Sequence, residues 1–500
     1  MEPRDLLAVM VVCSLLAVPL TTLPGTTGHD PADRDTVTVE ELKDHLYGPD
    51  PAETATVDRE VRVVLELADQ GNVPASEGLD IGRVYTAEGT RHVEASVPVG
   101  TVRALANDPS VQSVRFADPQ DVADDLVAPG VSVVGADALH DEDVVGENVT
   151  VGVIDSGFRV GHPSVVGSVG SYRSFDDDSS DDWRHGTAVA SVVADTAPGA
   201  TLHLASIGDT TTEAEYRAAV EWLEEAGADV IVDAGSYYGQ PGDGTGSIAH
   251  VAAEAANETV FVTSAGNHAE RYWRGNHTPD DPEWVEFDDD VDGNYLNGGE
   301  PIEGTVSLTL RWDEWPETET DYDIYLLRER IGARDVPVAT ATGHDGRPFE
   351  HLQTTVPEGR YYVAIRGDGV ESSSTLELFG NHELYHWTTG GQSAPATAPG
   401  VVTVGASADG ALQPYSVRDG VDVVAPDTVG AERLDVEGGT SFAAPYVAGV
   451  AALLVGEHPD LRPEEVRALL AENATAIETD DGEYDFGRVN ATASFGAVAA

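Results

Sequence analysis

The sequence has very little cysteine and very little positive charge. Its 500 residues include one cysteine, Cys13, and 27 lysines and arginines against 89 aspartates and glutamates, and Lys43 is the only lysine. A single thiol cannot form an intramolecular disulfide, so stability must come from packing, metal binding or salt. The formal net charge of −62 argues against nucleic acid and anionic membranes as partners, because both would repel the protein.

The acidic residues are spread along the whole chain, while 41% of all residues remain hydrophobic. This distribution argues against an acidic tail and against intrinsic disorder. At molar salt the Debye length falls to roughly 3 Å, which screens most of the repulsion between carboxylates. We therefore interpret the composition as an adaptation to concentrated brine. The alternative, a low-salt protein with an acidic partner surface, fits less well because the acids are everywhere.

The apolar run near the N-terminus, residues 6–20, has the length of a signal-peptide core and is short for a membrane span. It predicts a signal peptide over residues 1–28, whose cleavage would remove Cys13 and lead to secretion into the extracellular space. Only Arg4 makes the preceding segment basic, so an uncleaved N-terminal anchor is the alternative.

Composition and periodicity divide the rest of the chain. Residues 36–122 predict a small α+β unit, with strands at 61–67 and 92–99 and a helix then a strand within 100–117. Residues 128–270 and 391–497 show apolar strands alternating with helices, which predicts an α/β fold with a parallel sheet covered by helices on both faces. Residues 280–388 contain alternating strands separated by Pro, Gly and Asp, which predicts an inserted β-sandwich domain.

Three residues with complementary chemistry stand at the ends of predicted elements. Asp155 ends the buried strand "VGVID", His185 begins the small-residue helix "HGTAVASVVA", and Ser441 stands at the start of "GGTSFAAPYVAGVAALL". Each alone is commonly structural: a turn residue, a packed histidine and a helix N-cap. Together they supply a nucleophile, a general base and an orienting carboxylate, which acyl transfer requires.

An oxyanion also needs hydrogen-bond donors. The backbone N–H of Ser441 at a helix start is one candidate. The side-chain amide of Asn267, which ends "VTSAGN", is the second, although an asparagine there could equally be a structural turn residue.

The segments "VGVIDSG", "HGTAVASVVA", "SAGN" and "GGTSFAAPYVAGVAALL", in this order, resemble the hallmark motifs of subtilisin-like serine peptidases. With the acidic composition, the resemblance is to haloarchaeal-type members. It implies a seven-stranded parallel core sheet and endopeptidase activity on polypeptide substrates. It assigns Asp155, His185 and Ser441 to the catalytic triad and Asn267 to the oxyanion hole.

The resemblance extends to the flanking and inserted regions. It implies that residues 36–122 are a propeptide, a chaperone and temporary inhibitor that the enzyme removes by a cut between Pro119 and Val133. The insert resembles the bacterial pre-peptidase C-terminal β-sandwich, and is either a passive surface insertion or a border of the substrate cleft. A monomer is the default expectation.

Family members usually pair the substrate backbone with a Ser-Leu-Gly-like edge, and this sequence has "VDAGSYYG" at 232–239 instead. The residues predicted to contact substrate are Gly235, Ser236, Ser264, Ala265 and Gly266. The resemblance also implies Ca²⁺ at an unknown site. The stretch 288–293, "DDDVDG", begins like a calcium loop but has Gly299 at the twelfth position, and 175–183, "FDDDSSDDW", is an acidic loop that could hold calcium.

These observations predict a secreted, salt-adapted serine endopeptidase that matures by removing its own propeptide. An esterase would need a G-x-S-x-G motif, and here Ala443 replaces the second glycine. A catalytically silent secreted binding or adhesive protein that kept the fold is the remaining alternative, although all three triad residue types are present.

Overall fold

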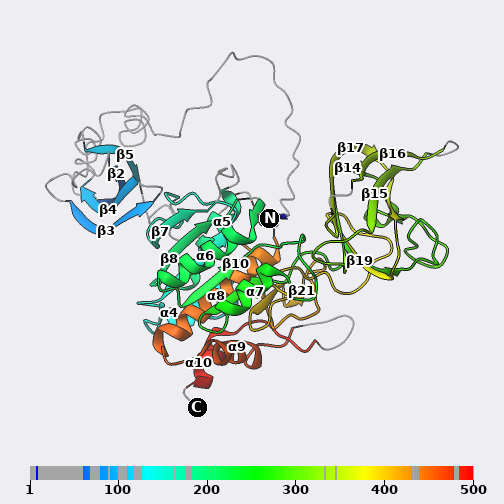
Figure 1. Cartoon of the computed structure of the whole chain (residues 1–500). Coiled ribbons are helices and arrows are strands. Elements are labelled where there is room, and N and C mark those ends of the chain that lie inside the picture. Colours follow the sequence, from blue (N-terminus) through cyan, green and yellow to red (C-terminus); the bar gives the residue numbers. More distant parts are fainter. Residues whose placement is uncertain are drawn as a thin grey trace.

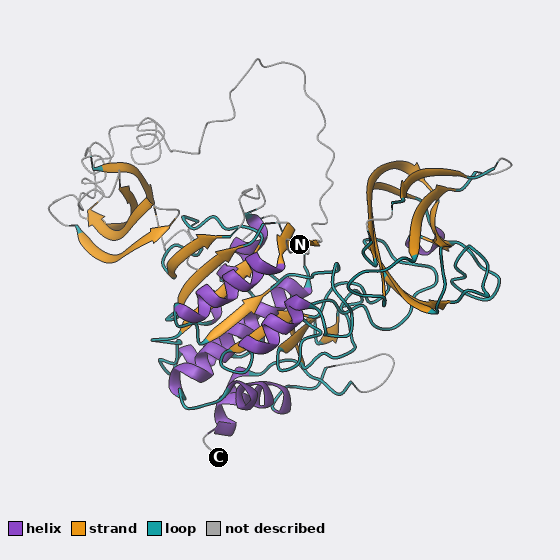
Figure 2. Ribbon diagram, viewed as in Figure 1, coloured by secondary structure: helices purple, strands orange, loops and turns teal. Residues whose placement is uncertain are grey.

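The structure, a computed structural model, describes residues 7–9, 60–67, 79–87, 90–98, 110–116, 127–162, 164–175, 183–208, 210–330, 334–343, 346–430, 434, 436, 438–477 and 484–498. Of the predicted signal segment, only β1 (Leu7–Val9) is described, paired with β9 (Thr210–Thr212). Figures 1 and 2 show a central α/β domain with a strand unit on either side.

Seven mutually parallel strands form the centre of the described chain. Most of their residues are apolar and buried, as expected when helices cover both faces of a sheet. In spatial order the strands are β7 (Val169–Ser174), β8 (Thr201–Ser206), β6 (Thr150–Asp155), β10 (Val230–Asp233), β11 (Val260–Ser264), β20 (Val402–Ala408) and β22 (Val423–Pro426).

Strand β10 shows how the side chains divide between the two faces. Val230 and Val232 belong to the core cluster that includes α5 (Arg184–Thr196) and α8 (Thr440–Glu457). Ile231 belongs to the cluster that includes α6 (Glu213–Glu225) and α7 (Ser247–Ala255). This alternation confirms the predicted α/β fold, a parallel sheet with helices on both faces.

Shorter elements complete this domain. A capping box at Thr212 and Glu215 fixes the start of α6. The other elements are α3 (Gly130–Val133), α4 (Ala136–His140), β21 (Ala411–Leu412), α9 (Pro463–Glu472) and α10 (Ala491–Val498).

The N-terminal unit is an antiparallel sheet in the order β3 (Asp80–Ala87), β4 (Thr90–Pro98), β2 (Glu60–Leu67), β5 (Val111–Phe116). It continues the central sheet, because β3 pairs with β7 at Thr86 and Ser171. The helix expected within 100–117 lies outside the described residues.

The insert consists of two four-stranded antiparallel sheets with apolar side chains from both in one cluster, as in a sandwich. The first contains β12 (Tyr272–His277), β19 (Ser374–Gly380), β14 (Ile302–Trp312) and β17 (Phe349–Gly359). The second contains β13 (Asn294–Tyr295), β18 (Tyr361–Asp368), β15 (Asp321–Arg328) and β16 (Val336–Ala341), with a short 3₁₀ turn, η1 (Asn297–Gly299), beside it. The first strand of the insert, β12, begins only five positions after Asn267.

Helix α8 is central to the packing of the domain. Among the described helices it is the one long and apolar enough to cross a membrane, but 78% of its apolar window is buried in the protein, as in a core helix. Gly449 of α8 packs against Thr196 of α5, where an added Cβ would lie 2.6 Å from Thr196 Cγ2. The two helices therefore approach each other through a position that has no room for a side chain.

We predict that Gly449→Ala destabilises the protein. Alanine gains up to about 1 kcal/mol over glycine inside a helix, whereas overpacking a filled core costs about 1–3 kcal/mol. Because Thr196 is fully buried and cannot move into solvent, we expect the overpacking cost to dominate. Thermal unfolding in high salt should show a melting temperature several degrees below that of the unmodified protein.

The matched control is Gly496→Ala in α10, where nothing lies within 4 Å of an added Cβ. This variant should be unchanged or slightly more stable. Equal shifts in both variants would show that close packing at Gly449 is not the cause.

Candidate active site

Asp155 and His185 lie side by side at the carboxyl edge of the parallel sheet. Asp155 ends β6 and is fully buried, and His185 is the second residue of α5. The His185 Nδ1 atom is 2.9 Å from Asp155 Oδ2 and 3.0 Å from Oδ1. The backbone N–H of Ser156 also donates to Asp155 Oδ1 at 2.8 Å, which holds the carboxylate in place. The carboxylate thereby fixes the orientation of the imidazole ring.

Gly186 makes this contact possible. A Cβ at this position would lie 2.9 Å from Asp155 Cβ and would also collide with the carbonyl oxygen of Gly157. A side chain there would push the first turn of α5 away from β6. The glycine that follows His185 is therefore required by the close approach of helix and strand.

Ser441 occupies the first turn of α8, next in the chain to a residue that contacts the imidazole. The ring of Phe442, the next residue, lies 5.1 Å from the ring of His185 between centroids. The half-buried Ser441 donates its hydroxyl to the carbonyl oxygen of Ala234 at 3.0 Å. The three sequence-predicted residues Asp155, His185 and Ser441 thus come together from β6, α5 and α8.

Asn267 is joined to the start of α8 through its side-chain oxygen. Asn267 Oδ1 accepts from the Thr440 backbone N–H at 3.0 Å and from the Thr440 hydroxyl at 2.9 Å. Because a backbone N–H can only donate, this contact identifies the oxygen of the amide and leaves Nδ2 directed elsewhere. An added Cβ at Gly439 would lie 3.2 Å from Nδ2, so glycine keeps the space near this donor open.

The residues predicted to bind substrate surround this site, but several of their polar groups already have protein partners. Gly235 N–H donates to Asp233 Oδ1, and Ala265 N–H donates to the Val404 carbonyl oxygen. Ser264 Oγ donates to the Ala234 oxygen at 3.3 Å and the Gly235 oxygen at 3.4 Å.

Gly266 has a φ of +106°, and its N–H donates to Thr440 Oγ1. Ser236 is partly exposed. Contact of these five residues with a substrate stays a prediction.

Asp233 is a buried carboxyl that the sequence analysis did not select. It ends β10 as Asp155 ends the neighbouring β6, and this shared placement was the available signal. Its oxygens accept the Gly235 N–H and the Tyr216 hydroxyl, both at 2.8 Å. Burial raises the pKa of Asp233 to about 7 despite these bonds, and the negative charge of Asp155 adds to the rise. Asp233 therefore anchors the turn whose Ala234 oxygen receives the Ser441 hydroxyl.

Neither acidic stretch forms a recognisable calcium site in the described residues. Residues 287–291 close as a tight turn, with Phe287 N–H bonded to the Val291 oxygen, so "DDDVDG" does not form a twelve-residue loop. Most of "FDDDSSDDW" lies outside the described residues. Within the described ranges, no group of three or more His, Cys, Asp or Glu residues could hold a metal ion. Ca²⁺ at an unknown site, which the resemblance implies, stays a prediction.

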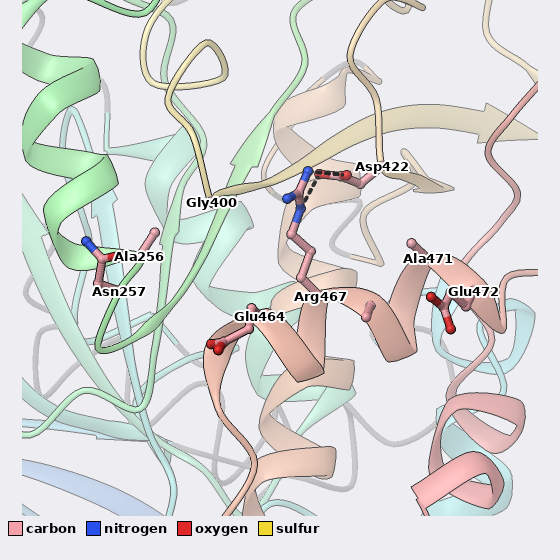
Figure 3. Close-up of a pocket in the computed structure, with 9 residues that line it drawn as sticks. Ala256, Asn257, Gly400, Asp422, Glu464, Arg467, Ala471 and Glu472 are labelled. Carbon is pink, nitrogen blue, oxygen red and sulfur yellow. Dashed lines mark hydrogen bonds and ion pairs between the residues drawn. The ribbon is translucent and has the colours of Figure 1, made fainter.

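A hollow of about 550 Å³ lies at the opposite edge of the sheet (Figure 3). Asn257 and Gly400 at its rim precede β11 and β20, so it lies at the amino ends of these strands. Arg467 crosses it to pair with Asp422, with Nη2 2.7 Å from Oδ1. This ion pair joins α9 to the loop before β22 and is distant from the site at the carboxyl edge.

We predict that Asp233→Asn makes the protein relatively more stable as pH rises. The native carboxyl keeps its proton to about pH 7, whereas an unfolded aspartate loses it near pH 4. Its contribution to stability is therefore fully present below about pH 4, falls as pH rises to about 7, and stays lost above that. Melting temperatures of Asp233→Asn and the unmodified protein should diverge in favour of the variant as pH rises, reflecting a difference in the free energy of unfolding on the order of a few kcal/mol.

Asp243→Asn is the control with the opposite sign. A hydrogen bond from the Thr245 hydroxyl lowers the pKa of Asp243. Its contribution is present above about pH 4 and is lost on acidification, so this variant should lose stability relative to the unmodified protein at neutral pH. Parallel pH curves for Asp233→Asn and the unmodified protein would contradict the protonated state of Asp233.

Comparison with known proteins agrees with this geometry. The Subtilase family matches residues 146–287 and 379–496, more than half of the chain, and the unmatched interval lies in the insert. Subtilisin E of Bacillus subtilis is 30% identical over 187 residues, which are 35% of this chain and 48% of that protein. The halolysin-like extracellular serine protease Nep of Natrialba magadii is 35% identical over 109 residues, 20% of each chain.

Among solved structures, the CspB protease of Clostridium perfringens has a similar fold. Its TM-score is 0.51 at 16% identity, with 74% of this chain and 99% of that chain covered. The chain spans about half the length of the curated subtilisins it matches. On the family match and the order of its elements, the chain belongs to the Subtilase family.

Proposed function

We propose that this protein is a secreted, salt-adapted serine endopeptidase that hydrolyses polypeptides through an acyl-enzyme and removes its own propeptide. The observation that carries the proposal is the convergence of Asp155, His185 and Ser441 at one edge of the sheet. Family membership supports it.

His185 acts as the general base. Its Nδ1 faces the Asp155 carboxylate, which leaves Nε2 as the nitrogen that takes the proton of Ser441. The hydroxyl, which rests on the Ala234 oxygen, turns to Nε2 as its oxygen attacks the scissile carbonyl carbon. The imidazolium then returns the proton to the leaving amine, and water hydrolyses the acyl-enzyme by the same route.

Asn267 Nδ2 and the Ser441 backbone N–H stabilise the oxyanion. The first turn of α8 leaves the N–H of Ser441 without an intrahelical acceptor. The two bonds from Thr440 hold Asn267 before substrate arrives, so its donor does not reorganise during the reaction. An extended substrate would lie along Gly235 and Ser236 and along 264–266.

Secretion, salt adaptation and maturation rest on the sequence. The apolar run 6–20, the charge of −62 and the similarity to the extracellular protease Nep support a protein that works outside the cell in brine. Val127, within the predicted cleavage interval, is 48% exposed, which favours proteolysis there. The released propeptide, residues 36–122, would be a partner of the mature monomer. None of the proposed reaction steps involves Ca²⁺.

We predict that Ser441→Ala abolishes both maturation and activity. The unmodified chain, expressed in multi-molar salt, should lose its N-terminal unit and hydrolyse casein. Without the nucleophile, casein hydrolysis should fall by at least about 10³-fold and the precursor should keep its full size. Precursor size is followed by mass spectrometry.

Ser494→Ala is the matched control, because it also removes one bond from a serine to a carbonyl oxygen, that of Leu469, but at α10. It should mature and cleave normally. If Ser441→Ala matures and cleaves as well as the unmodified chain, the triad assignment is wrong. If all three proteins fold but stay full length and inert, the chain is a binding protein that kept the fold.

A separate prediction concerns Asn267→Asp, which keeps an acceptor for Thr440 and removes the Nδ2 donor. If Nδ2 stabilises the oxyanion, kcat should fall by about 10²–10³ with little change in KM. Peptide hydrolysis kinetics and melting temperature are measured together. Reduced stability with unchanged kcat would instead make Asn267 a structural turn residue.

A further inference from the structure

The inserted sandwich meets the central domain at the segments that border the active site. One is the substrate edge, which we define as residues 235–240, directly after β10. Another is His268, which follows Asn267. The substrate edge contacts β14 and β19 of the first sheet of the insert, and His268 contacts β19. In Figure 1 this sheet lies to one side of the central domain. The contacts are of two kinds, ionic and aromatic.

Arg311 of β14 is the ionic contact, and its side chain is only 1% exposed. Its Nε donates to Glu377 of β19 at 2.7 Å. Its Nη1 donates to the Gln240 carbonyl oxygen at 3.1 Å and its Nη2 to the Gln392 carbonyl oxygen at 3.0 Å. We call Arg311, Glu377 and these two carbonyl groups the Arg311 clamp. The rigid guanidinium group thus binds the Glu377 carboxylate of the insert and, at the same time, the carbonyl oxygens of Gln240 and Gln392, which lie outside the sandwich strands.

Gly242 in the central domain leaves space for the clamp. A Cβ at this position would lie 2.6 Å from Glu377 Oε2 and would collide with the guanidinium of Arg311. The loop between β10 and α7 is therefore shaped to receive the ion pair of the insert. Burial alone would raise the pKa of Glu377, but Arg311 and the Tyr272 hydroxyl reverse this and hold the pKa below its ordinary value. The Glu377 side chain in the clamp is thus a charged carboxylate paired with Arg311.

The aromatic contact reaches both the substrate edge and His268, the residue after Asn267. Tyr238 of the substrate edge and His268 lie 4.8 Å and 5.5 Å from the ring of Phe379 in β19. The Tyr238 hydroxyl is also 3.2 Å from His268 Nδ1. Burial, helped by the charge of Arg271, lowers the pKa of His268 to about 3, so His268 packs as a neutral ring. Phe379 thus lies under both segments.

We propose that the inserted sandwich positions the substrate edge through the Arg311 clamp and Phe379, and so forms part of the binding apparatus for extended peptides. This inference rests on the proposed peptidase function for its kinetic consequence. Gln240 connects the clamp to α7. Its backbone oxygen binds Arg311, and its side-chain oxygen accepts from Ser247 Oγ at 3.1 Å and from the Ile248 N–H at 3.4 Å. The loop is fixed at both ends, and Arg311 is a positioning residue.

The first experiment needs no catalysis. Hydrogen exchange of residues 235–246 is measured in full-length Ser441→Ala protein in high salt, alone and combined with Arg311→Lys. Lysine keeps the positive charge, but its compact ammonium lacks the planar fork that reaches Glu377 and both carbonyl oxygens. We expect exchange in this segment to accelerate by about tenfold or more, with the β14 core unchanged. Unchanged exchange in 235–246 overturns the proposal.

A second variant guards against misfolding caused by an unpaired buried charge. The double variant Arg311→Met/Glu377→Met removes both partners and keeps similar volume, which is often tolerated. The matched control is Arg360→Met, which breaks an ion pair with Glu329 (2.9 Å) inside the insert, at a residue 48% exposed. The double variant should accelerate exchange in 235–246, and Arg360→Met should leave it unchanged. Equal acceleration in both would mean that general loosening, and not the clamp, is responsible.

The kinetic consequence is tested with the active Ser441 protein. Arg311→Lys should raise KM for long peptides by roughly tenfold or more, while the rate of Ser441 labelling by a small sulfonyl fluoride stays the same. Equal KM values in Arg311→Lys and the unmodified protein would overturn the binding role. An unmodified protein that neither labels nor cleaves would refute the proposed function, and the exchange result would still decide whether the insert positions the loop.

Discussion

Helix α5 packs on strand β6 and on helix α8 as closely as backbone atoms allow, and the site depends on this packing. Gly186 has no room for a Cβ beside Asp155, and Gly449 has none beside Thr196. A side chain at either position would separate the elements that carry Asp155, His185 and Ser441. The small residues of these helices are therefore required by the geometry of the site as well as by the core.

A second constraint is the shortage of cations in a chain with a net charge of −62. Exposed carboxylates can rely on salt for screening, but buried ones need a partner or a proton. Glu377 has Arg311. Asp195 accepts the backbone N–H of Ala128, and burial raises its pKa to about 7. Burial also raises the pKa of Asp233 to about 7. Buried carboxyl groups of this protein are therefore neutralised in two ways, by an arginine or by a proton.

Much of the fold and of the site could be predicted because the signals are local. The apolar runs ending at Asp155, Asp233 and Ser264 indicate buried parallel strands, and alternation in residues 280–388 indicates a sandwich. Strand β3 was missed, because "DIGRVYTA" mixes polar residues and glycine into a weak pattern, and its pairing comes from the neighbouring strand β4. Asp233 was missed because an aspartate after a strand is commonly a turn residue; burial distinguishes it.

The sequence by itself determined most of the strand and helix order of the α/β domain, the identity of Asp155, His185, Ser441 and Asn267 as candidates, and the electrostatic character of the surface. Each of these depends on residue type and on spacing over a few positions. Only the tertiary structure decided that Asn267 is held by Thr440, that Asp233 supports the Ala234 carbonyl, and that Arg311 grips the loop at Gln240. These contacts join residues on different elements, in the first and last cases far apart in the chain, and their geometry exists only once the sheet, helices and insert have packed.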